Sequence, residues 1–329
     1  MSASLTAPNY TDHEKGFFIT EAVVGLDAIN NGIAYVATGV KNDQYVVPVL
    51  TANPKLNPRT LLPVDNSTTV LSNKVIQLGA FEAYELFDPN VFENHWHSSE
   101  LADKLLTRGL PSTFSNYLGG FYTQKTFVPV GNMIHIGSTT YTTSAALPAD
   151  VNYSHKYFDG LIKQALNVST PALQVATPIA LTSANIISKM EAAKALMPKA
   201  LLSKANRYAR LKFIMSVEDI EKYEEALTST TYKNNDTTEA GIRKYKGYSI
   251  VSDAGLPENT FYFCEAATDV NSNIHMPVTS MENLTFELNR LQNNSSAWFY
   301  KAIAKMGVAI AKPTEFVIYT TKTLANFNA

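Results

Sequence analysis

The feature that most constrains this sequence is a long polar segment placed between two strand-like runs. Residues 44–50 and 74–84 are rich in β-branched and other apolar residues, as strands are. The segment between them, residues 51–72, holds three prolines and three asparagines: Pro54, Pro58, Pro63, Asn53, Asn57 and Asn66. A loop of more than twenty residues inside a compact domain is uncommon and is usually functional. We therefore expect residues 51–72 to project from the body of the protein and to reach another surface.

The amino-terminal residues form a second segment that lacks the pattern of a packed element. Residues 1–30 mix proline, glycine and isolated apolar residues without a sustained period, which is typical of an arm. The same residues contain neither a basic region nor the apolar stretch of a signal peptide. No apolar run approaches the ~20 residues that cross a bilayer. The sequence thus predicts no membrane partner and a protein made and kept in a cytosol-like compartment.

The composition narrows the classes of protein further. Hydrophobic residues make up 45% of the 329 residues, which excludes a disordered chain, and the net charge of −2 excludes a basic nucleic-acid-binding protein. Charged residues make up 17%, below the roughly 25% of soluble domains, so the surface is polar but weakly charged. Such a surface suits protein–protein contact. The single cysteine, Cys264, stands in an apolar run and is expected to be a buried thiol.

The middle of the chain predicts both helices and strands. The first clear helix is expected to begin at Ser98, which can cap it, and to end at Gly109. The elements expected after it are a helical segment at 112–118, a strand at 121–130, a turn and helix at 155–166, and a helix at 183–204 that Pro198 divides.

The last part of the chain continues the mixture. A strand at 210–215 leads into Ser216, which is expected to cap the next helix. The remaining elements are expected as strands at 245–252, 260–265, 308–310 and 316–319, and as a helix at 296–306. Helices and strands alternate without a regular βα repeat, so the sequence predicts an α+β fold.

The sequence contains no set of residues arranged for catalysis. His95 and His97 could both reach one metal ion from a strand, but the third ligand would have to be His13, His135, His155 or a distant carboxylate. A polar stretch before a helix is the simpler interpretation. Residues 269–273 imitate the start of a calcium loop, yet Ile274 and Ser280 stand where Gly and Glu are required, so we expect a turn. We nominate no catalytic, cofactor-binding or metal-binding residue.

Charge is distributed unevenly in the second half of the chain. Between Lys189 and Lys212 there are seven Lys and Arg residues against Glu191 alone, and between Glu218 and Glu225 there are five acids against one lysine. The lysines are spaced by five residues, so they spiral around a helix instead of lining one face. This pattern favours a solvated face, or charge complementarity between neighbouring copies, over a groove for nucleic acid.

Three segments carry a resemblance to a known family. Residues 74–86 followed by 92–96 form the first, and residues 134–137 with 157–163, Tyr-Phe-Asp-Gly-Leu-Ile-Lys, form the second. The third runs from Phe213-Ile-Met-Ser-Val-Glu-Asp-Ile through Tyr245-Lys-Gly-Tyr to Leu256-Pro-Glu-Asn-Thr. In this order, over residues 20–322, the chain resembles the major capsid proteins of tailed bacteriophages. Their fold is shared with encapsulin shells and the herpesvirus capsid floor.

The resemblance implies a specific organisation of the α+β fold. It implies an N-terminal arm, an extended loop, a peripheral domain with a spine helix, and an axial domain. The expected boundaries are 1–30 for the arm, 31–80 for the extended-loop hairpin, 81–180 for the peripheral domain, 181–280 for the axial domain and 281–329 for a return to the peripheral domain. The lysine–asparagine crosslink of some relatives is not carried over, because no matching motif surrounds Lys41 or Asn42.

The resemblance also implies a structural function. The chain would assemble with itself into pentamers and hexamers of an icosahedral shell around packaged double-stranded DNA, which it would touch only non-specifically. Portal, scaffolding and decoration proteins are the expected partners, and the virion, assembled in the host cytoplasm, is the expected location. Two alternatives stay open at this point: an encapsulin-type compartment shell, and a cytosolic metal-dependent α+β enzyme that uses His95 and His97.

Overall fold

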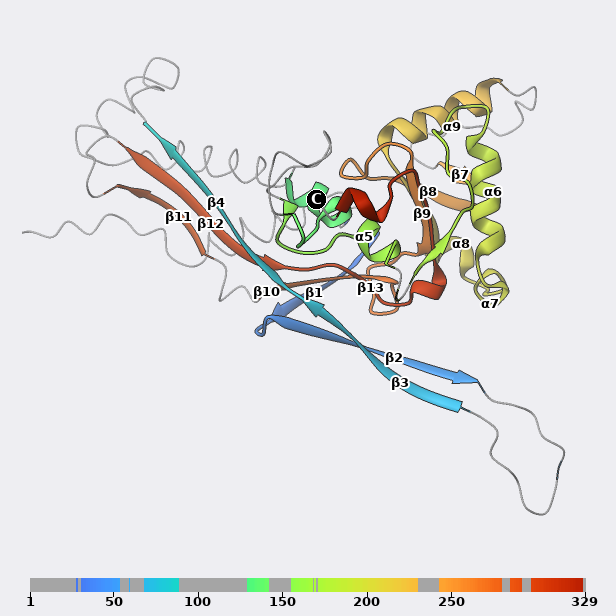
Figure 1. Ribbon diagram of the computed structural model, residues 1–329, viewed down its shortest axis with the longest axis horizontal. Coiled ribbons are helices and arrows are strands. Elements are labelled where there is room, and N and C mark those ends of the chain that lie inside the picture. The colour runs from blue at the N-terminus through green and yellow to red at the C-terminus, as the bar shows by residue number, and fades with distance from the viewer. Residues whose placement is uncertain are drawn as a thin grey trace, which may run out of the picture.

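The computed structural model describes residues 28, 31–53, 59, 68–88, 129–141, 155–167, 169, 171–229, 243–279, 285–291 and 297–327. These residues form two six-stranded sheets and a separate two-stranded hairpin, together with short helices. The predicted α+β class is confirmed. Figure 1 shows the two sheets side by side, with the hairpin leading away from both of them. None of the described helices is long and apolar enough to cross a membrane.

The first sheet joins strands from both ends of the chain. Its order is β1 (Tyr35–Val40), β10 (Ile274–Thr279), β12 (Trp298–Met306) and β11 (Thr285–Arg290), while β13 (Ala309–Ile310) pairs with β10 and β4 (Gly79–Phe87) pairs with β12. The β4–β12 pairing is antiparallel and runs from Gly79 opposite Met306 to Phe87 opposite Trp298. The long strands β4 and β12, with β11 beside β12, extend to one end of the molecule (Figure 1).

The second sheet is covered by helices. Its order is β5 (Leu173–Gln174), β14 (Phe316–Thr320), β9 (Thr260–Glu265), β6 (Leu211–Met215), β8 (Tyr248–Ser252) and β7 (Lys244–Tyr245). The helices beside it are α6 (Ile186–Leu196), α7 (Lys199–Leu202), α8 (Arg207–Arg210) and α9 (Val217–Ser229). β14 comes from the C-terminal part of the chain and lies between β5 and β9. The five predicted domain boundaries stay a prediction.

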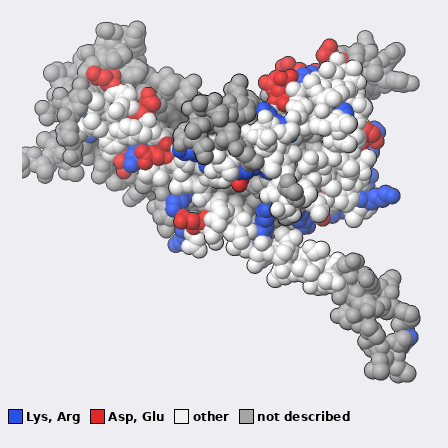
Figure 2. Space-filling view, in the orientation of Figure 1, with Lys and Arg blue, Asp and Glu red and all other residues white. Residues whose placement is uncertain are grey.

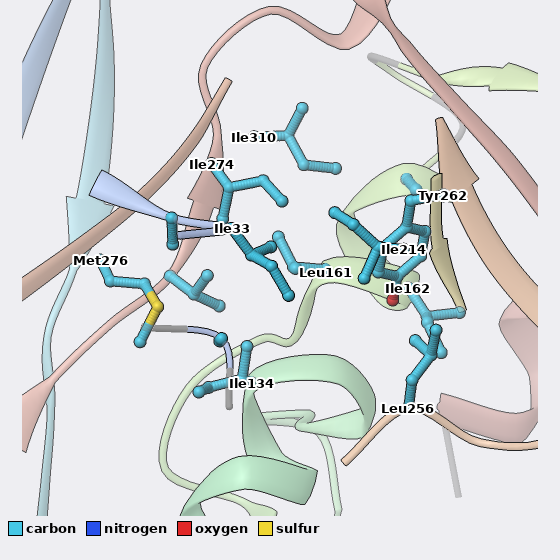
Figure 3. Close-up of a cluster of buried hydrophobic side chains, with 14 of the residues drawn as sticks. Ile33, Ile134, Leu161, Ile162, Ile214, Leu256, Tyr262, Ile274, Met276 and Ile310 are labelled. Atoms are coloured by element: carbon cyan, nitrogen blue, oxygen red, sulfur yellow. The ribbon is translucent and has the colours of Figure 1, made fainter. Parts of the chain in front are cut away.

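The two sheets surround two hydrophobic cores, and the second sheet contributes side chains to both. The core of the first sheet includes Ile33, Ile134, Leu161 and Ile274, and Figure 3 shows these side chains converging from different elements. The second core is aromatic: the rings of Phe213 and Phe263 stack with their centroids 4.2 Å apart, beneath α6 and α9. Successive side chains of a strand point to opposite faces, so β6 and β9 can supply both cores. Ile214 and Tyr262 belong to the first core, and Phe213 and Phe263 belong to the second.

Local sequence signals explain the helix boundaries near the second sheet. The Ser216 hydroxyl accepts a hydrogen bond from the Asp219 N–H at 3.1 Å, and this confirms the predicted N-cap of α9. Pro198 separates α6 from α7, as predicted, because proline cannot continue the hydrogen-bond pattern of a helix. Cys264 is buried in β9, as expected, and burial raises the pKa of its thiol.

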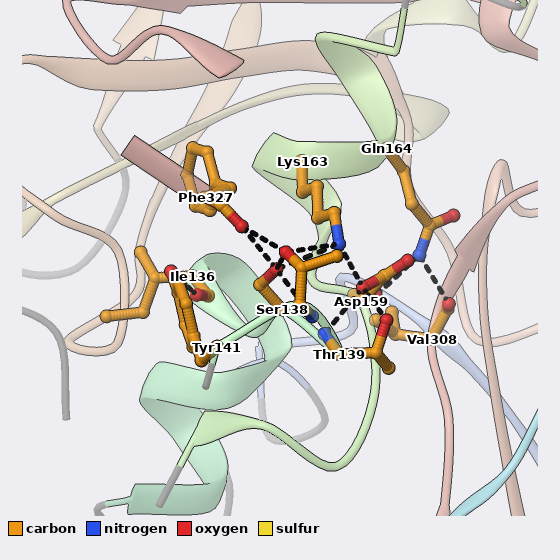
Figure 4. A network of polar contacts seen from close by, with 10 residues as sticks. Ile136, Ser138, Thr139, Tyr141, Asp159, Lys163, Gln164, Val308 and Phe327 are labelled. Carbon is orange, nitrogen blue, oxygen red and sulfur yellow. Dashed lines mark hydrogen bonds and ion pairs between the residues drawn. The ribbon is translucent and has the colours of Figure 1, made fainter. Parts of the chain in front are cut away.

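A polar network fastens the C-terminal end of the described chain to the first core (Figure 4). The Lys163 ammonium, on α5 (Leu161–Ala165), donates to the Ser138 hydroxyl and to the Asp159 carboxylate, each at 2.8 Å. The hydroxyls of Ser138, at 2.7 Å, and Thr140 donate in turn to the Phe327 carbonyl. The Phe327 side chain is fully buried, so the 3₁₀ helix Leu324–Phe327 is held both by packing and by hydrogen bonds.

The expectation of a helix at residues 296–306 is wrong, because residues 298–306 form the strand β12. Every residue of β12 pairs with β4, and six of them also pair with β11, so the backbone groups are satisfied by neighbours distant in sequence. Residues 129 and 130, expected at the end of a strand, are helical within a helix at 129–136. The rest of the predicted strand at 121–130 lies outside the described residues.

Two predicted strand runs are interrupted, and the predicted loop 51–72 is shorter than expected. The run at 245–252 is a hairpin of β7 and β8 that turns at Lys246 and Gly247, both with positive φ. The run at 74–84 is divided at Leu78 into two strands. The segment 51–72 is strand at both ends, because β2 runs to residue 53 and β3 begins at residue 68. Apart from residue 59, its centre lies outside the described residues. The predicted helix at 98–109, the segment 112–118 and, apart from residue 28, the arm lie outside them as well.

Candidate assembly surface

The hairpin of β2 (Gln44–Asn53) and β3 (Thr68–Gln77) is the element that stands apart from both sheets. Its two strands pair over ten residues each, from Gln44 opposite Gln77 to Asn53 opposite Thr68. Figure 1 shows it projecting from the body of the molecule and ending at the segment predicted to project. An isolated two-stranded hairpin is at best marginally stable in water, so this element depends on what its faces contact.

One face of the hairpin is anchored at its root. Val47 and Ile76 are buried there against Ala309, and Tyr45 and Val49 pack beside them. Gly307 permits this close approach, because a Cβ at that position would lie 2.7 Å from the Gln77 carbonyl oxygen. The root is also held by an ion pair of 2.7 Å between Lys305 and Asp43.

The opposite face carries a row of exposed apolar side chains. Val46 lies opposite Val75, and Leu50 lies opposite Leu71, so the four share one face of the hairpin. Their exposed fractions are 45% for Val46 and Val75, 66% for Leu50 and 68% for Leu71. We call these four residues the apolar strip. Large apolar side chains grouped in this way mark an interaction surface more often than chance exposure.

The face that bears the apolar strip has no ionisable side chain. The period of two along each strand puts ten residues on it: Gln44, Val46, Pro48, Leu50, Ala52, Thr69, Leu71, Asn73, Val75 and Gln77. Lys74, the nearest lysine, belongs to the opposite face with its partner Val47. These ten residues offer no cationic side chain to a phosphate or an acidic ligand, and the apolar ones among them can be buried against another protein surface.

A polar cleft of about 480 Å³ lies beside the hairpin root, between β2 and the second sheet. Its charged groups neutralise one another. Arg210 binds the two Asp269 oxygens at 2.7 and 2.8 Å and also contacts Glu265, and Lys204 reaches Glu265 at 3.2 Å. The hydrogen bonds from Arg210 lower the pKa of Asp269 to about 2. These groups form an ion-pair network.

The histidines considered as metal ligands are not brought together in the described part of the chain. His13, His95 and His97 lie outside the described residues. His135 and His155 are buried, and no group of three or more potential ligands forms within the described ranges. His135 instead faces Asp253, with its Nε2 3.0 Å from the carboxylate oxygen.

The residues that imitate a calcium loop form the expected turn. The Asp269 carboxylate accepts the Asn271 N–H at 2.9 Å and is bound by Arg210, so its oxygens are engaged by the protein itself.

This chain resembles known proteins in its structure, but no family model matches the sequence, and no curated protein matches it. The fold is similar to the capsid of a native GTA particle, with 11% identity, a TM-score of 0.54, and coverage of 90% of this chain and 91% of that one. It is also similar to the procapsid of satellite phage P4, with 6% identity, a TM-score of 0.59 and coverage of 95% and 92%.

A third similar structure is that of Gordonia phage Cozz, with 12% identity, a TM-score of 0.55 and coverage of 90% and 86%. The likeness extends over nearly the whole of each chain. The protein therefore has the fold of tailed-phage capsid proteins, as the sequence resemblance predicted. The apolar strip was not foreseen from the sequence, although Val46 and Leu50 on one strand and Leu71 and Val75 on the other repeat at even spacings.

Proposed function

We propose that this chain is the major capsid protein of a tailed phage, which assembles with itself into the icosahedral shell around the packaged DNA. The observation that carries the proposal is the projecting hairpin with its uncharged apolar strip, in a fold that it shares with phage capsids. Fold alone does not determine function, so the proposal rests on this surface. The capsids compared do not favour the two alternatives, an encapsulin-type shell or a metal-dependent enzyme.

The energy available from the apolar strip is sufficient for assembly by many weak contacts. Full burial of a Val or Leu side chain contributes about 1.5–3 kcal/mol, and the four residues of the strip are about half exposed. Covering the strip would thus contribute roughly 4 kcal/mol for each copy. This is too little for a stable dimer, but the same contact recurs at every copy in a closed shell.

The role in the proposal is structural and not catalytic. Pentamers and hexamers of this chain would form the shell in the host cytoplasm and remain in the virion. Portal, scaffolding and decoration proteins would bind to it, and the packaged DNA would meet it without sequence recognition. The net charge of −2 is consistent with weak contact to DNA, since affinity for the duplex grows with the number of phosphates neutralised.

Adjacent residues on opposite faces of β3 provide a matched test. Leu71, in the strip, is 68% exposed, and Val70, on the other face, is 50% exposed. We expect the purified chain, alone or with its scaffolding partner, to form hollow shells in negative-stain microscopy. Leu71→Thr, and more strongly Leu50→Thr/Leu71→Thr, should raise the concentration needed for assembly. Val70→Thr should leave it close to that of the wild type.

Stability of the free subunit serves as the control. All these positions are exposed, so thermal melts of the variants should agree with the wild type to within about 0.5 kcal/mol. A wild-type chain that remains monomeric in sedimentation at every concentration, with scaffold present, would refute the proposed function. Equal effects of Leu71→Thr and Val70→Thr would show that the strip is not the contact surface.

A further inference from the structure

The helices beside the second sheet carry an acidic surface that the function above does not use. Helix α9 has Glu218, Glu221 and Glu225 on its solvent side, at spacings of three and four residues that place them on one face. Figure 2 shows the acidic side chains gathered over this helix. Within the described part of the chain, Glu218 and Glu221 have no ion-pair partner, whereas Glu224 is paired with Arg243.

A cationic surface lies at the opposite end of the same unit. α6 runs from the vicinity of α9 to α7, as Figure 1 shows, and its eleven residues span about 16 Å. Lys199 on α7 is exposed, and Arg207 begins α8. Neither has a carboxylate partner among the described residues. The Arg207 guanidinium instead lies 4.5 Å from the centroid of the Tyr208 ring.

Each charged end also exposes a large apolar side chain. Val217, the first residue of α9, is 43% exposed beside the acidic row. Tyr208 is 45% exposed beside Arg207, and Leu196, at the end of α6, is 40% exposed. An apolar centre with charged groups around it is the usual anatomy of a protein–protein interface, in which tyrosine and arginine are enriched. Both ends therefore have the composition of a contact surface, and their charges are opposite.

The arrangement of the charges restricts how two copies can meet. Because the two charged surfaces lie at opposite ends of the unit, a two-fold contact would have to bring both ends of each copy into one interface, whereas a contact between one acidic end and one cationic end uses a different end of each copy. A head-to-tail contact places the α9 face of one copy on the Lys199–Arg207 end of the next. A head-to-tail contact repeats from copy to copy and forms a ring when the rotation closes.

We propose that the acidic α9 face of one copy binds the cationic α7–α8 end of a second copy, head to tail, and that this contact builds the ring-shaped capsomer. The inference rests on the proposed function, since it names the contact that sets neighbouring copies around one axis. Glu218 and Glu221 pair with Lys199 and Arg207 of the next copy, and Val217 packs against Tyr208. The contact is electrostatic in part, so added salt weakens ring formation.

Charge reversal with rescue tests the pairing directly. Glu218→Lys/Glu221→Lys should repel the cationic end, and Lys199→Glu/Arg207→Glu should repel the acidic face. Each double variant should raise the concentration for half-maximal assembly about tenfold or more in sedimentation velocity at low salt. The variant with all four substitutions restores opposite charges and the wild-type net charge, so it should assemble like the wild type. Thermal melts of the monomers confirm that each variant is folded.

The outcomes of these assembly assays distinguish a failure of the head-to-tail contact from a failure of the proposed shell function. If the wild type forms shells and neither double variant weakens assembly, the head-to-tail contact is refuted while the shell function stands. If each double variant blocks assembly and the fourfold variant does not restore it, the two ends do not bind each other, and the pairing is refuted. Binding of duplex DNA by the wild-type subunit that Lys199→Glu/Arg207→Glu abolishes would assign the cationic end to nucleic acid and overturn the inference. A wild type that never assembles overturns both.

Discussion

Asp253→Asn should destabilise the subunit, because it removes the buried carboxylate that faces His135. The Asp253 Oδ2 atom lies 3.0 Å from His135 Nε2, with side chains that are 3% and 1% exposed. His135 Nδ1 is 3.3 Å from the Tyr262 hydroxyl, and the Asp253 Oδ1 atom accepts the Gly255 N–H at 3.0 Å. The pair connects the helix at 129–136 to the loop that follows β8.

The size of the effect follows from burial. Removing one partner of a buried ion pair costs about 3–5 kcal/mol. Asparagine keeps the Oδ1 acceptor for the Gly255 N–H, so we expect the lower end, about 3 kcal/mol. The unfolding entropy of 329 residues is about 0.7 kcal/mol/K, which converts 3 kcal/mol into a fall in Tm of about 4 °C.

The difference between the two proteins should depend on pH. Burial alone would raise the pKa of Asp253, but the charge of His135 and the bond from Gly255 outweigh it, so the pKa lies below that of a free aspartate. A depressed pKa contributes stability above the unfolded value of about 3.9, and the contribution is lost as the pH falls through the folded value. The gap in Tm should thus be full at pH 7 and should narrow below pH 4.

Calorimetry of the free subunit from pH 7 to pH 3 measures both effects. Tyr262→Phe is the control, because it removes the hydroxyl near His135 without removing a charge, and it should cost only about 1 kcal/mol at every pH. An Asp253→Asn variant that melts within 1 °C of the wild type at pH 7 would refute the reasoning. A gap of constant size down to pH 3 would refute the assigned role of the carboxylate.

Three further predictions concern other parts of the molecule. Phe327→Ala removes a fully buried ring and should lower the free energy of unfolding by about 3–5 kcal/mol in urea, whereas a loss below 1 kcal/mol would contradict its role as the C-terminal anchor. Ser216→Ala removes the α9 cap and should cost about 1 kcal/mol, with little change expected from Ser188→Ala on the exposed side of α6. The free subunit should show no sub-micromolar affinity for duplex DNA at physiological salt, and such affinity in a filter or fluorescence assay would count against a shell protein.

Three strands of the second sheet, β6, β9 and β14, could be predicted because their apolar sequences favour a buried strand. All six residues of β9 are buried, and its centre is a continuous apolar run, Phe-Tyr-Phe-Cys. The start of α9 could be predicted because its cap is local: Ser216 and Asp219 lie within one turn. Both signals depend on residues close together in sequence, which is why the structure confirms the predictions made from them.

The strand β12, which the sequence predicted as a helix, shows that local sequence signals carry no information about distant pairing partners. Ala302, Ala304 and Lys305 are compatible with a helix, and intrinsic preference there favours one. The strand exists because Lys301 pairs with Tyr84 of β4 and with Glu287 of β11, and the β4 partner is more than two hundred residues away in the chain. Strand preference is decided by such neighbours more than by the residue itself, so the sequence alone cannot reveal it.

The apolar strip could not be predicted from the sequence, for a related reason. Val46 and Leu50 alternate with Val47 and Val49 in one strand, and both sets have the composition of a core. Only the position of the hairpin, outside both sheets, shows that Val47 is buried by the root while Leu50 is left exposed. Under the proposed function, the subunit needs residues of core composition that have no partner in their own chain. Its sequence would then resemble that of a protein with a larger core, and the apolar strip is the part of that core which folding alone does not bury.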